Sequence, residues 1–397
     1  MTRGAALFAA LLLAAGCTPG SREAAPFEGR WESEGHGTFM VVDGGSVEFY
    51  EHTAVSCVRV QEGAARGISD VLSFEGERLV LDDDGRIVRL DRIDFLPPRC
   101  GDDFFTDDPA ATLAVLDATF AEHYLPGVDA AWEQRLAAIR LSADAAPEAV
   151  HAAIVSVLAP LGDPEVRLLA PGADDPLWVA AEPGGSVRES LPDDVVEDDA
   201  GLLVGDLGGV GYLAITSLDA TGSREETVLG VALDRVLAQA GDALVLDLRM
   251  ASGGLDRIAR LVASRFVPTS RSIGAREASA HGEPIAAGEV LVNPVAGGPH
   301  AGSLVVLVGP GTSGSGEVLA AALAGVPGAI LAGLPTAGRP GQTLVRLLPN
   351  GWSIGVPHLA LRLPDGRLIG PAGLQPQVTL PGDPAAQLQE AATLAGE

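Results

Sequence analysis

The sequence has 397 residues, of which 47% are hydrophobic and 20% are charged. This composition provides enough apolar side chains for two or three packed domains and excludes a chain that is disordered throughout. The formal net charge is −27, which argues against nucleic acid as a partner and against a basic membrane-binding surface. The sequence contains no lysine, which excludes mechanisms that need a lysine base, a Schiff base or a P-loop lysine.

The amino terminus has the pattern of a targeting segment. An apolar run over residues 5–15 is shorter than the roughly 20 residues of a membrane-spanning helix, and it leads through small residues to Cys17. Residues 1–17 resemble a bacterial lipoprotein signal peptide, in which the cysteine is lipidated after cleavage; the alternative is an ordinary signal peptide with a chance cysteine. We therefore expect an extracytoplasmic, membrane-anchored lipoprotein of the cell envelope, in the periplasm if the cell is Gram-negative, with lipid on Cys17 and residues 18–26 as its tether.

Residues 27–100 alternate short apolar runs with turn residues, which predicts a small antiparallel β domain. In an oxidising compartment Cys57 and Cys100 are expected to pair, closing a loop worth roughly 3–4 kcal/mol in the chain-entropy model. A function located in this domain is one hypothesis. Its conspicuous polar and aromatic residues are His36, Tyr50 and His52, which we expect at the surface.

Residues 108–170 show helical periodicity and predict a helical subdomain. The acidic, Pro/Gly-rich residues 171–201 are interpreted as a loop or flap. Strand and helix patterns then alternate over residues 202–380, which predicts a layered α/β domain. No cysteine spacing suggests a metal site, and we expect neither metal nor cofactor.

Gly309-Pro310-Gly311-Thr312-Ser313-Gly314 fits the dinucleotide fingerprint G-x-G-x-x-G, between a predicted strand and a predicted helix. That fingerprint expects an acidic residue about 20 positions further on, to hold a ribose. No Asp or Glu occurs between Glu317 and Asp365, so the pattern argues against a dinucleotide site. Ser313 and Ser315 are then either caps of the following helix or nucleophiles at its amino terminus.

A second strand pattern, over residues 243–249, ends in charge and leads to Gly253 and Gly254. Consecutive glycines after a strand allow backbone amides to point at a ligand, as an oxyanion hole requires. We therefore name Gly253 and Gly254 as candidate oxyanion donors.

These segments together resemble the tail-specific (C-terminal-processing) serine peptidase family. Asp247-Leu248-Arg249 with Gly253-Gly254 is similar to its D-L-R-x-N-x-G-G motif, residues 312–317 to T-x-S-S/A-x-E, and residues 333–338 to G-x-x-T-x-G. Residues 350–352 and 370–376 resemble the pattern that closes its catalytic domain. The resemblance implies a crotonase/ClpP-like α/β peptidase core over residues 202–380, preceded by the helical subdomain, and a serine-type peptidase acting on polypeptides.

The sequence departs from the family at the positions that carry chemistry. Gly314 stands where the resemblance places the nucleophile, and Arg339 stands where lysine-dependent members have their lysine. Members that use histidine have it where Glu165 stands. Ala251 and Gln377 replace an Asn and an Asp. Arginine stays protonated, so Arg339 is a poor general base.

Two hypotheses follow for the activity. One is a serine peptidase that uses Ser315 or Ser313, with Ser315 preferred because it lies nearer the helix start. The other is a catalytically inactive, peptidase-like lipoprotein that binds peptide segments or a protein partner by strand addition. Glu165, His123, His151 and His358 are the bases considered, and a carboxylate such as Glu165 needs burial to raise its pKa.

Overall fold

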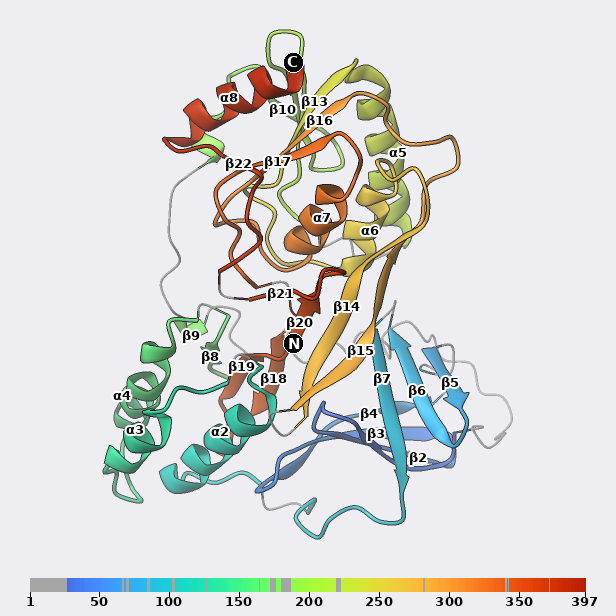
Figure 1. Cartoon of the computed structure of the whole chain (residues 1–397). Coiled ribbons are helices and arrows are strands. Elements are labelled where there is room, and N and C mark those ends of the chain that lie inside the picture. Colours follow the sequence, from blue (N-terminus) through green and yellow to red (C-terminus); the bar gives the residue numbers. More distant parts are fainter. Residues whose placement is uncertain are drawn as a thin grey trace. The chain divides into compact units, whose positions relative to one another are not determined.

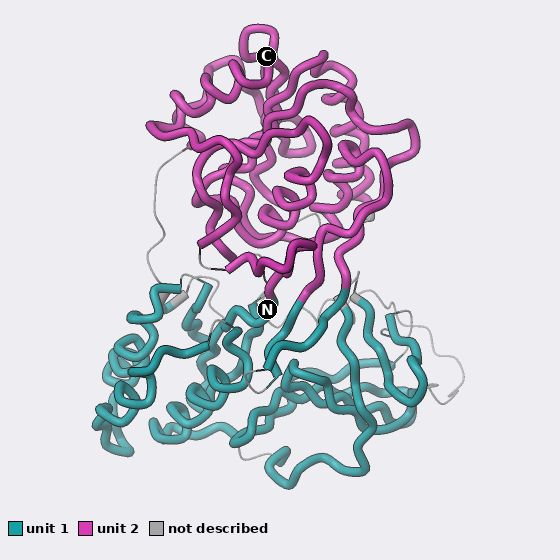
Figure 2. Tube along the Cα trace, viewed as in Figure 1, with its two compact units in different colours: residues 1–182, 277–288, 342–359 teal, residues 183–276, 289–341, 360–397 magenta. Residues whose placement is uncertain are grey.

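A computed structural model describes residues 27–397 with the exception of 66–67, 69–70, 84–85, 102–103, 126, 164, 172–175, 180–186, 219–222, 281–282, 340, 342 and 371. The expected signal peptide and tether, Cys17 included, lie outside the described residues. The chain divides into two compact units (Figure 2). Unit 1 comprises residues 1–182, 277–288 and 342–359, and unit 2 comprises residues 183–276, 289–341 and 360–397.

The N-terminal part of unit 1 is a seven-stranded antiparallel sheet with the strand order β4-β3-β2-β1-β7-β6-β5 (Figure 1). Its strands are β1 (Gly29–Ser33), β2 (Thr38–Asp43), β3 (Ser46–His52), β4 (Cys57–Ala64), β5 (Leu72–Glu75), β6 (Arg78–Asp83) and β7 (Arg86–Ile93). Trp31 pairs with Met40 on one side and with Arg92 on the other, and alternate residues of the strands form an apolar core around Trp31. Cys57, the first residue of β4, forms a disulfide with Cys100.

Three helices follow in unit 1. They are α2 (Pro109–His123), α3 (Trp132–Ala138) and α4 (Pro147–Leu158), with a 3-10 turn at Ala159–Leu161. Helix α2 begins at Asp108, whose carboxylate accepts from the Ala110 amide at 3.0 Å, and Pro109 provides a fixed first-turn φ. Phe120, Trp132 and Ile154 pack together against a four-stranded sheet of the order β18-β19-β8-β9. Its strands are β8 (Arg167–Leu169), β9 (Pro176–Val179), β18 (Thr343–Leu347) and β19 (Ser353–Pro357).

Residues 171–201 are more regular than expected. They contain β9, a 3-10 turn at Arg188–Ser190 and β10 (Val196–Glu197). β9 pairs with β8 and β10 pairs with β11, so strand pairing orders segments whose composition alone indicates a loop. Within the described residues of this interval, these two strands and the 3-10 turn differ from the loop or flap expected.

Unit 2 is built on a seven-stranded sheet of the order β10-β11-β12-β13-β16-β17-β22. The strands after β10 are β11 (Leu203–Asp206), β12 (Gly211–Ala214), β13 (Ala243–Asp247), β16 (Ser303–Val308), β17 (Ala329–Gly333) and β22 (Val378–Thr379). The five strands from β12 to β22 run parallel, whereas β10 and β11 pair in antiparallel fashion. Parallel neighbours require crossover helices, which the alternating sequence pattern predicted.

Helices cover both faces of this sheet. One face packs against α5 (Ser223–Gln239), α6 (Asp256–Ala263) and α7 (Ser315–Ala324), and the other packs against α8 (Pro384–Gly396). The pleat explains the separation: Leu246 and Val306 point to the first face, and Val245 and Val305 to the second. A further sheet of the order β15-β14-β20-β21 contains β14 (Arg271–Ala280), β15 (Glu283–Val292), β20 (Leu359–Arg362) and β21 (Leu368–Ile369).

A mixed α/β architecture with an antiparallel N-terminal sheet is thus confirmed. The finer domain boundaries expected from the sequence stay a prediction. None of the helices in the described part of the chain combines the length and apolarity needed to cross a membrane. Within those same residues, no group of three His, Cys, Asp or Glu side chains is placed to hold a metal ion.

Of the six histidines that the structure describes, four lie buried in unit 1, contrary to the surface position expected for His36 and His52. The exposed fractions of His36, His52, His123 and His358 are between 0% and 9%. The rings of His36 and His358 meet edge to face at 4.8 Å. Arg346 of β18, also buried, donates to the carbonyl oxygens of His36 and Gly37. We call these four histidines and Arg346 the histidine cluster.

Charge in the histidine cluster disfavours further protonation of His123. Burial is the main cause that lowers the pKa of His123 well below its ordinary value, and the positive charge of Arg346 and the neighbouring His36 and His52 add to it. Carboxylates also face the cluster, since Glu122 lies 3.9 Å from His123, Glu51 lies 3.9 Å from Arg346, and Glu32 lies 3.6 Å from His52. The folded protein therefore keeps His123 neutral at a pH where the unfolded chain protonates it.

We expect acid to destabilise the protein through His123. Because its pKa is lowered by folding, the unfolded state binds more protons below about pH 6.5, and the free energy of unfolding falls by up to about 1.4 kcal/mol per pH unit. Chemical denaturation of wild type and His123→Gln between pH 7.5 and 5.5 measures this slope, which the substitution should flatten. His151→Gln in α4, whose imidazole is partly exposed, is the control. Equal slopes for wild type and His123→Gln would contradict the assignment.

Candidate active site

The two segments that the sequence analysis singled out meet at the carboxyl ends of β13 and β16. The strands are parallel neighbours, with Asp247 opposite Leu307. Beyond them, the Ser313 amide donates to the Ala251 carbonyl at 3.0 Å, and the Ser315 amide donates to the Gly253 carbonyl at 3.1 Å. The glycine loop after β13 and the Gly/Ser turn before α7 are therefore hydrogen-bonded to each other along their length. We call this junction the loop site.

A buried ion pair fixes the start of the glycine loop. Asp247 and Arg249 are 0% and 3% exposed, and Arg249 Nη2 lies 2.7 Å from Asp247 Oδ2. Tyr212 of β12 donates its hydroxyl to the same carboxylate at 3.0 Å, and burial together with the Asp247 charge raises the pKa of Tyr212. The other arm of Arg249 donates to the Pro384 carbonyl and to Gln387, which ties α8 to the loop.

Thr312 joins the two loops from within. Its side chain is fully buried, and its hydroxyl donates to the Leu248 carbonyl at 2.7 Å while accepting from the Gly309 amide at 3.1 Å. One hydroxyl thus satisfies two backbone groups that would otherwise be buried without partners. This threonine is the first residue of the T-x-S-S/A-x-E resemblance, and its function here is to hold the turn.

The amides of Gly253 and Gly254 are available for a ligand. Both residues have positive φ, 63° and 89°, which glycine adopts without strain. Among the described residues, no atom accepts a hydrogen bond from either amide. A Cβ at Gly254 would come within 2.7 Å of the Leu218 backbone, so that position requires glycine. The arrangement suits backbone donors for an oxyanion, and the assignment of Gly253 and Gly254 to that function stays a prediction.

Gly314 has the backbone geometry of a nucleophile turn but no side chain. Its φ of 59° and ψ of −127° lie outside the regions that ordinary residues adopt, and it stands immediately before α7. A Cβ there would lie 2.9 Å from Cα and 3.1 Å from N of Gly253. Its amide donates to the Arg339 carbonyl at 2.8 Å. The nucleophile and lysine positions named by the resemblance therefore adjoin, and they hold Gly314 and Arg339.

The two candidate serines have different surroundings. Ser315 is 4% exposed, and its hydroxyl donates to Asp256 Oδ1, the first residue of α6, at 2.9 Å. The other oxygen of Asp256 is paired with Arg276 of β14, which is also buried. Ser313 is partly exposed, and within the described part of the chain its hydroxyl has no hydrogen-bond partner. Ser315 thus has a carboxylate within the reach that a general base needs, and Ser313 does not.

Glu317, one turn into α7, is a fully buried carboxylate. Thr336 donates its hydroxyl to Oε1, and the amides of Gly338 and Arg339 donate to Oε1 and Oε2 at 2.8 and 2.5 Å. Burial raises the pKa of Glu317 to about 7, against the opposing effect of these three hydrogen bonds and of the Arg339 charge. The glutamate and the T-x-G turn of the resemblance are therefore one hydrogen-bonded unit.

Comparison with known proteins decides the family. Residues 209–380, which include the whole loop site, match Peptidase family S41. This segment of the chain belongs to peptidase family S41. The resemblance to C-terminal-processing serine peptidases is thereby confirmed. A search of curated proteins finds no match to the chain.

One solved structure shares the fold, and two others are similar at lower TM-scores. A candidate peptidase from Parabacteroides merdae has a TM-score of 0.61 at 17% identity, over 72% of this chain and 96% of that one. The photosystem II D1 C-terminal processing protease has a TM-score of 0.45 at 19% identity, over 74% and 98%. A lipoprotein from Streptococcus agalactiae has a TM-score of 0.47 at 14% identity, over 77% and 98%.

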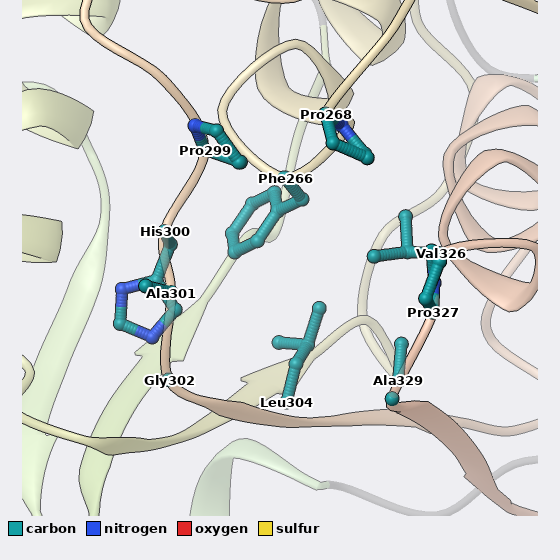
Figure 3. A pocket seen from close by; sticks show the side chains of 11 residues that line it. Phe266, Pro268, Pro299, His300, Ala301, Gly302, Leu304, Val326, Pro327 and Ala329 are labelled. Atoms are coloured by element: carbon teal, nitrogen blue, oxygen red, sulfur yellow. The ribbon is translucent and has the colours of Figure 1, made fainter.

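The bases considered from the sequence do not lie in unit 2, to which the serines belong. Glu165, His123, His151 and His358 belong to unit 1, whereas both serines belong to unit 2. His300 of unit 2 lines a small pocket with Phe266, Leu304 and Val326 (Figure 3). That pocket adjoins the amino end of β16, whereas the loop site follows its carboxyl end.

Asp256 is the residue that sequence reasoning missed. The sequence feature that could have identified Asp256 is its position two residues after Gly254, at the start of the helix that follows the glycine loop. An acidic residue there is equally typical of a helix amino terminus, so the sequence does not distinguish the two functions.

We expect the Asp247–Arg249 pair to dominate the stability of the loop site. Arg249→Met leaves a fully buried carboxylate without its cation, which typically costs about 3–5 kcal/mol. Arg188→Met removes an exposed pair with Glu197, 58% and 51% exposed, and should change stability by less than about 1 kcal/mol. Denaturant titration of the two variants compares them, and similar losses for both would contradict this interpretation.

Proposed function

We propose that this chain is a serine-type peptidase that acts on polypeptides, with Ser315 as nucleophile and Asp256 as its general base. The S41 segment supports the class of reaction. The observation on which the proposal rests is the 2.9 Å hydrogen bond from the Ser315 hydroxyl to Asp256, beside the unpaired amides of Gly253 and Gly254. Nucleophile, base and oxyanion donors are the three parts that acyl transfer needs within contact of one another.

The reaction follows from these positions. As Ser315 Oγ attacks the peptide carbonyl carbon, its proton moves to Asp256 Oδ1, and the carbonyl oxygen becomes an oxyanion held by the Gly253 and Gly254 amides. Asp256 then returns the proton to the leaving amine as the C–N bond breaks. Water, deprotonated by Asp256, hydrolyses the acyl-enzyme and restores the Ser315 hydroxyl. Arg276 orients the carboxylate throughout through its second oxygen.

One specific observation favours a second candidate function. Gly314 and Arg339 occupy the adjoining positions at which the family resemblance expects serine and lysine, and neither supplies nucleophile or base. The second candidate is therefore an inactive peptidase-like lipoprotein that binds polypeptide segments at the same loops. It uses the same free amides to hold a carbonyl or carboxylate group, without cleavage.

We also propose that residues 202–380 form a crotonase/ClpP-like core, a type of layered α/β fold. The parallel strands β12, β13, β16, β17 and β22, with helices on both faces, are consistent with that class. The extracytoplasmic location is proposed from the amino-terminal pattern, and the disulfide between Cys57 and Cys100 supports an oxidising compartment.

Proteolysis of an unfolded protein substrate by residues 18–397 tests the primary proposal. We expect cleavage by wild type, a loss of at least about 10³-fold in kcat/KM for Ser315→Ala, and a comparable loss for Asp256→Asn. Ser313→Ala is the matched control, because it removes the same hydroxyl two residues away and should leave the rate within a few-fold of wild type.

Other outcomes of this experiment have definite meanings. Loss of cleavage in Ser313→Ala, with Ser315→Ala active, would transfer the nucleophile assignment to Ser313. No cleavage by wild type, combined with saturable binding of an extended fluorescent peptide, would overturn the primary proposal in favour of the second. Cleavage that survives Ser313→Ala combined with Ser315→Ala would show that the activity lies at another site or in a contaminant.

The lipid anchor is tested separately. Because a cysteine thiol is the acceptor, Cys17→Ser should abolish incorporation of labelled fatty acid and move the protein from the membrane fraction to the soluble fraction. Cys57→Ser with Cys100→Ser is the control for general loss of cysteine, and it should stay in the membrane fraction. Equal membrane association of the Cys17→Ser variant would contradict the anchor.

A further inference from the structure

Glu317 connects the loop site to the turn that follows β17. Its two carboxylate oxygens accept from Thr336, Gly338 and Arg339, and the Thr336 hydroxyl in turn accepts from the Leu374 amide at 2.7 Å. One side chain therefore orients three residues of the turn directly and Leu374, in a second segment, through Thr336. Glu317 is fully buried and Thr336 is 5% exposed, whereas Gly338 and Arg339 are partly exposed.

The same turn holds the residues that precede Ser315. The Arg339 carbonyl accepts from the Gly314 amide at 2.8 Å, and the Ala337 amide donates to the Thr312 carbonyl at 3.0 Å. A continuous chain of hydrogen bonds thus leads from the Glu317 carboxylate through residues 336–339 to residues 312–314. We propose that Glu317 is a positioning residue whose ionised form holds this turn, and hence the Ser315 hydroxyl, in the reactive geometry.

The donors around Glu317 explain why its ionised form is the organising one. A carboxylate accepts at both oxygens, so all three donors are satisfied at once. A proton on Oε2 would place an O–H donor against the Arg339 amide, which is also a donor, and this hydrogen bond would be lost. The Arg339 bond is the one that leads directly to Gly314.

The charges near Glu317 leave it able to titrate near neutral pH. Burial outweighs the three hydrogen bonds and the positive charge of Arg339, which raises the pKa to about 7. On the neighbouring helix α6, the charge of Asp256 is balanced by Arg276. Ionisation of Glu317 therefore lowers the free energy of unfolding at the pH where it organises the turn. Such a local loss of stability is common at functional sites.

Stability and activity should consequently change in opposite directions with pH. A carboxyl group whose pKa is raised by folding stabilises the protein below its unfolded value of about 4.5, and that contribution is lost as the pH rises through 7. Activity, which needs the ionised form, rises over the same interval. A residue with a purely structural function would change both quantities in the same direction.

Glu317→Gln tests the inference. Only the measurements of kcat rest on the proposed function. We expect wild-type kcat to fall about tenfold per pH unit below pH 7, and the variant to have a kcat at least tenfold lower at pH 8.5 with little pH dependence between 6 and 8.5. KM should change little. Glu226→Gln, which removes a carboxylate paired with Arg257 in the same unit, should keep the wild-type profile.

Two readouts are independent of catalysis. The Tm of Glu317→Gln minus that of wild type should increase from pH 6 to pH 8, because only the wild type loses stability by ionising. Hydrogen exchange of the Gly338 and Arg339 amides should accelerate in the variant at pH 8. If the wild type cleaves nothing, the proposed function fails. The Tm difference and the hydrogen exchange then still test whether ionised Glu317 holds the turn. Unchanged exchange and a pH-independent Tm difference would overturn the inference, as would a variant with the wild-type pH–rate profile.

Discussion

The loop site depends on the ion pair between Asp247 and Arg249. Both charges are removed from water, so each would be costly alone, and the pair is stable because every strong donor and acceptor around it is used. Asp247 ends a central parallel strand and Arg249 begins the loop. The pair therefore sets the direction in which the chain leaves the sheet, and with it the orientation of the Gly253 and Gly254 amides. Its contacts to Tyr212, Pro384 and Gln387 extend the same constraint to β12 and α8.

The site keeps the backbone of a serine peptidase more fully than its side chains. The free amides, the positive φ of Gly314 before α7 and the hydrogen bond between positions 314 and 339 are all backbone features. What differs is that glycine and arginine stand where the family resemblance expects serine and lysine. Backbone geometry alone stabilises an oxyanion or binds a carbonyl group, whereas bond cleavage also needs a nucleophile and a base. The two candidate functions separate at this step, which is why Ser315 and Asp256 are decisive.

Much of the core could be predicted from the sequence because its signals are local. Periodicity predicted helices within residues 108–170 and alternating strands and helices over residues 202–380, and the structure has α2, α3 and α4 in the first range and β12 to β17 with their helices in the second. The two loops lie next to each other because parallel strands present their carboxyl ends at one edge, a pairing that the structure adds. The neighbouring long strands β14 and β15 were not predicted, since their alternating small and charged residues give a weak strand pattern. Asp256, the hydrogen-bond partner of Ser315, was missed for a different reason. The two residues are 59 positions apart, and no local sequence pattern predicts such a contact.

The histidines show the same limit in unit 1. His36 and His52 are polar and lie in turn-rich sequence, which favours the surface, yet both are buried around Arg346. The contacts of His36 with Arg346 and His358 join residues more than 300 positions apart in the chain. Composition gives the number of polar side chains in a chain, but the tertiary contacts determine which of them are buried.

The conformation of Gly314 bears directly on which serine acts. A side chain at this position would meet the Gly253 backbone at 2.9 Å, closer than real Cβ atoms approach, and would also carry the strain of a positive φ. A serine here therefore requires the glycine loop to move outward by several tenths of an ångström. In the present structure the loop lies close to Gly314, and the Ser315 amide donates to the Gly253 carbonyl. The loop that would supply the oxyanion donors thus lies against Gly314 and is hydrogen-bonded to the Ser315 amide. Ser315 is also the serine whose hydroxyl donates a hydrogen bond to a carboxylate, that of Asp256.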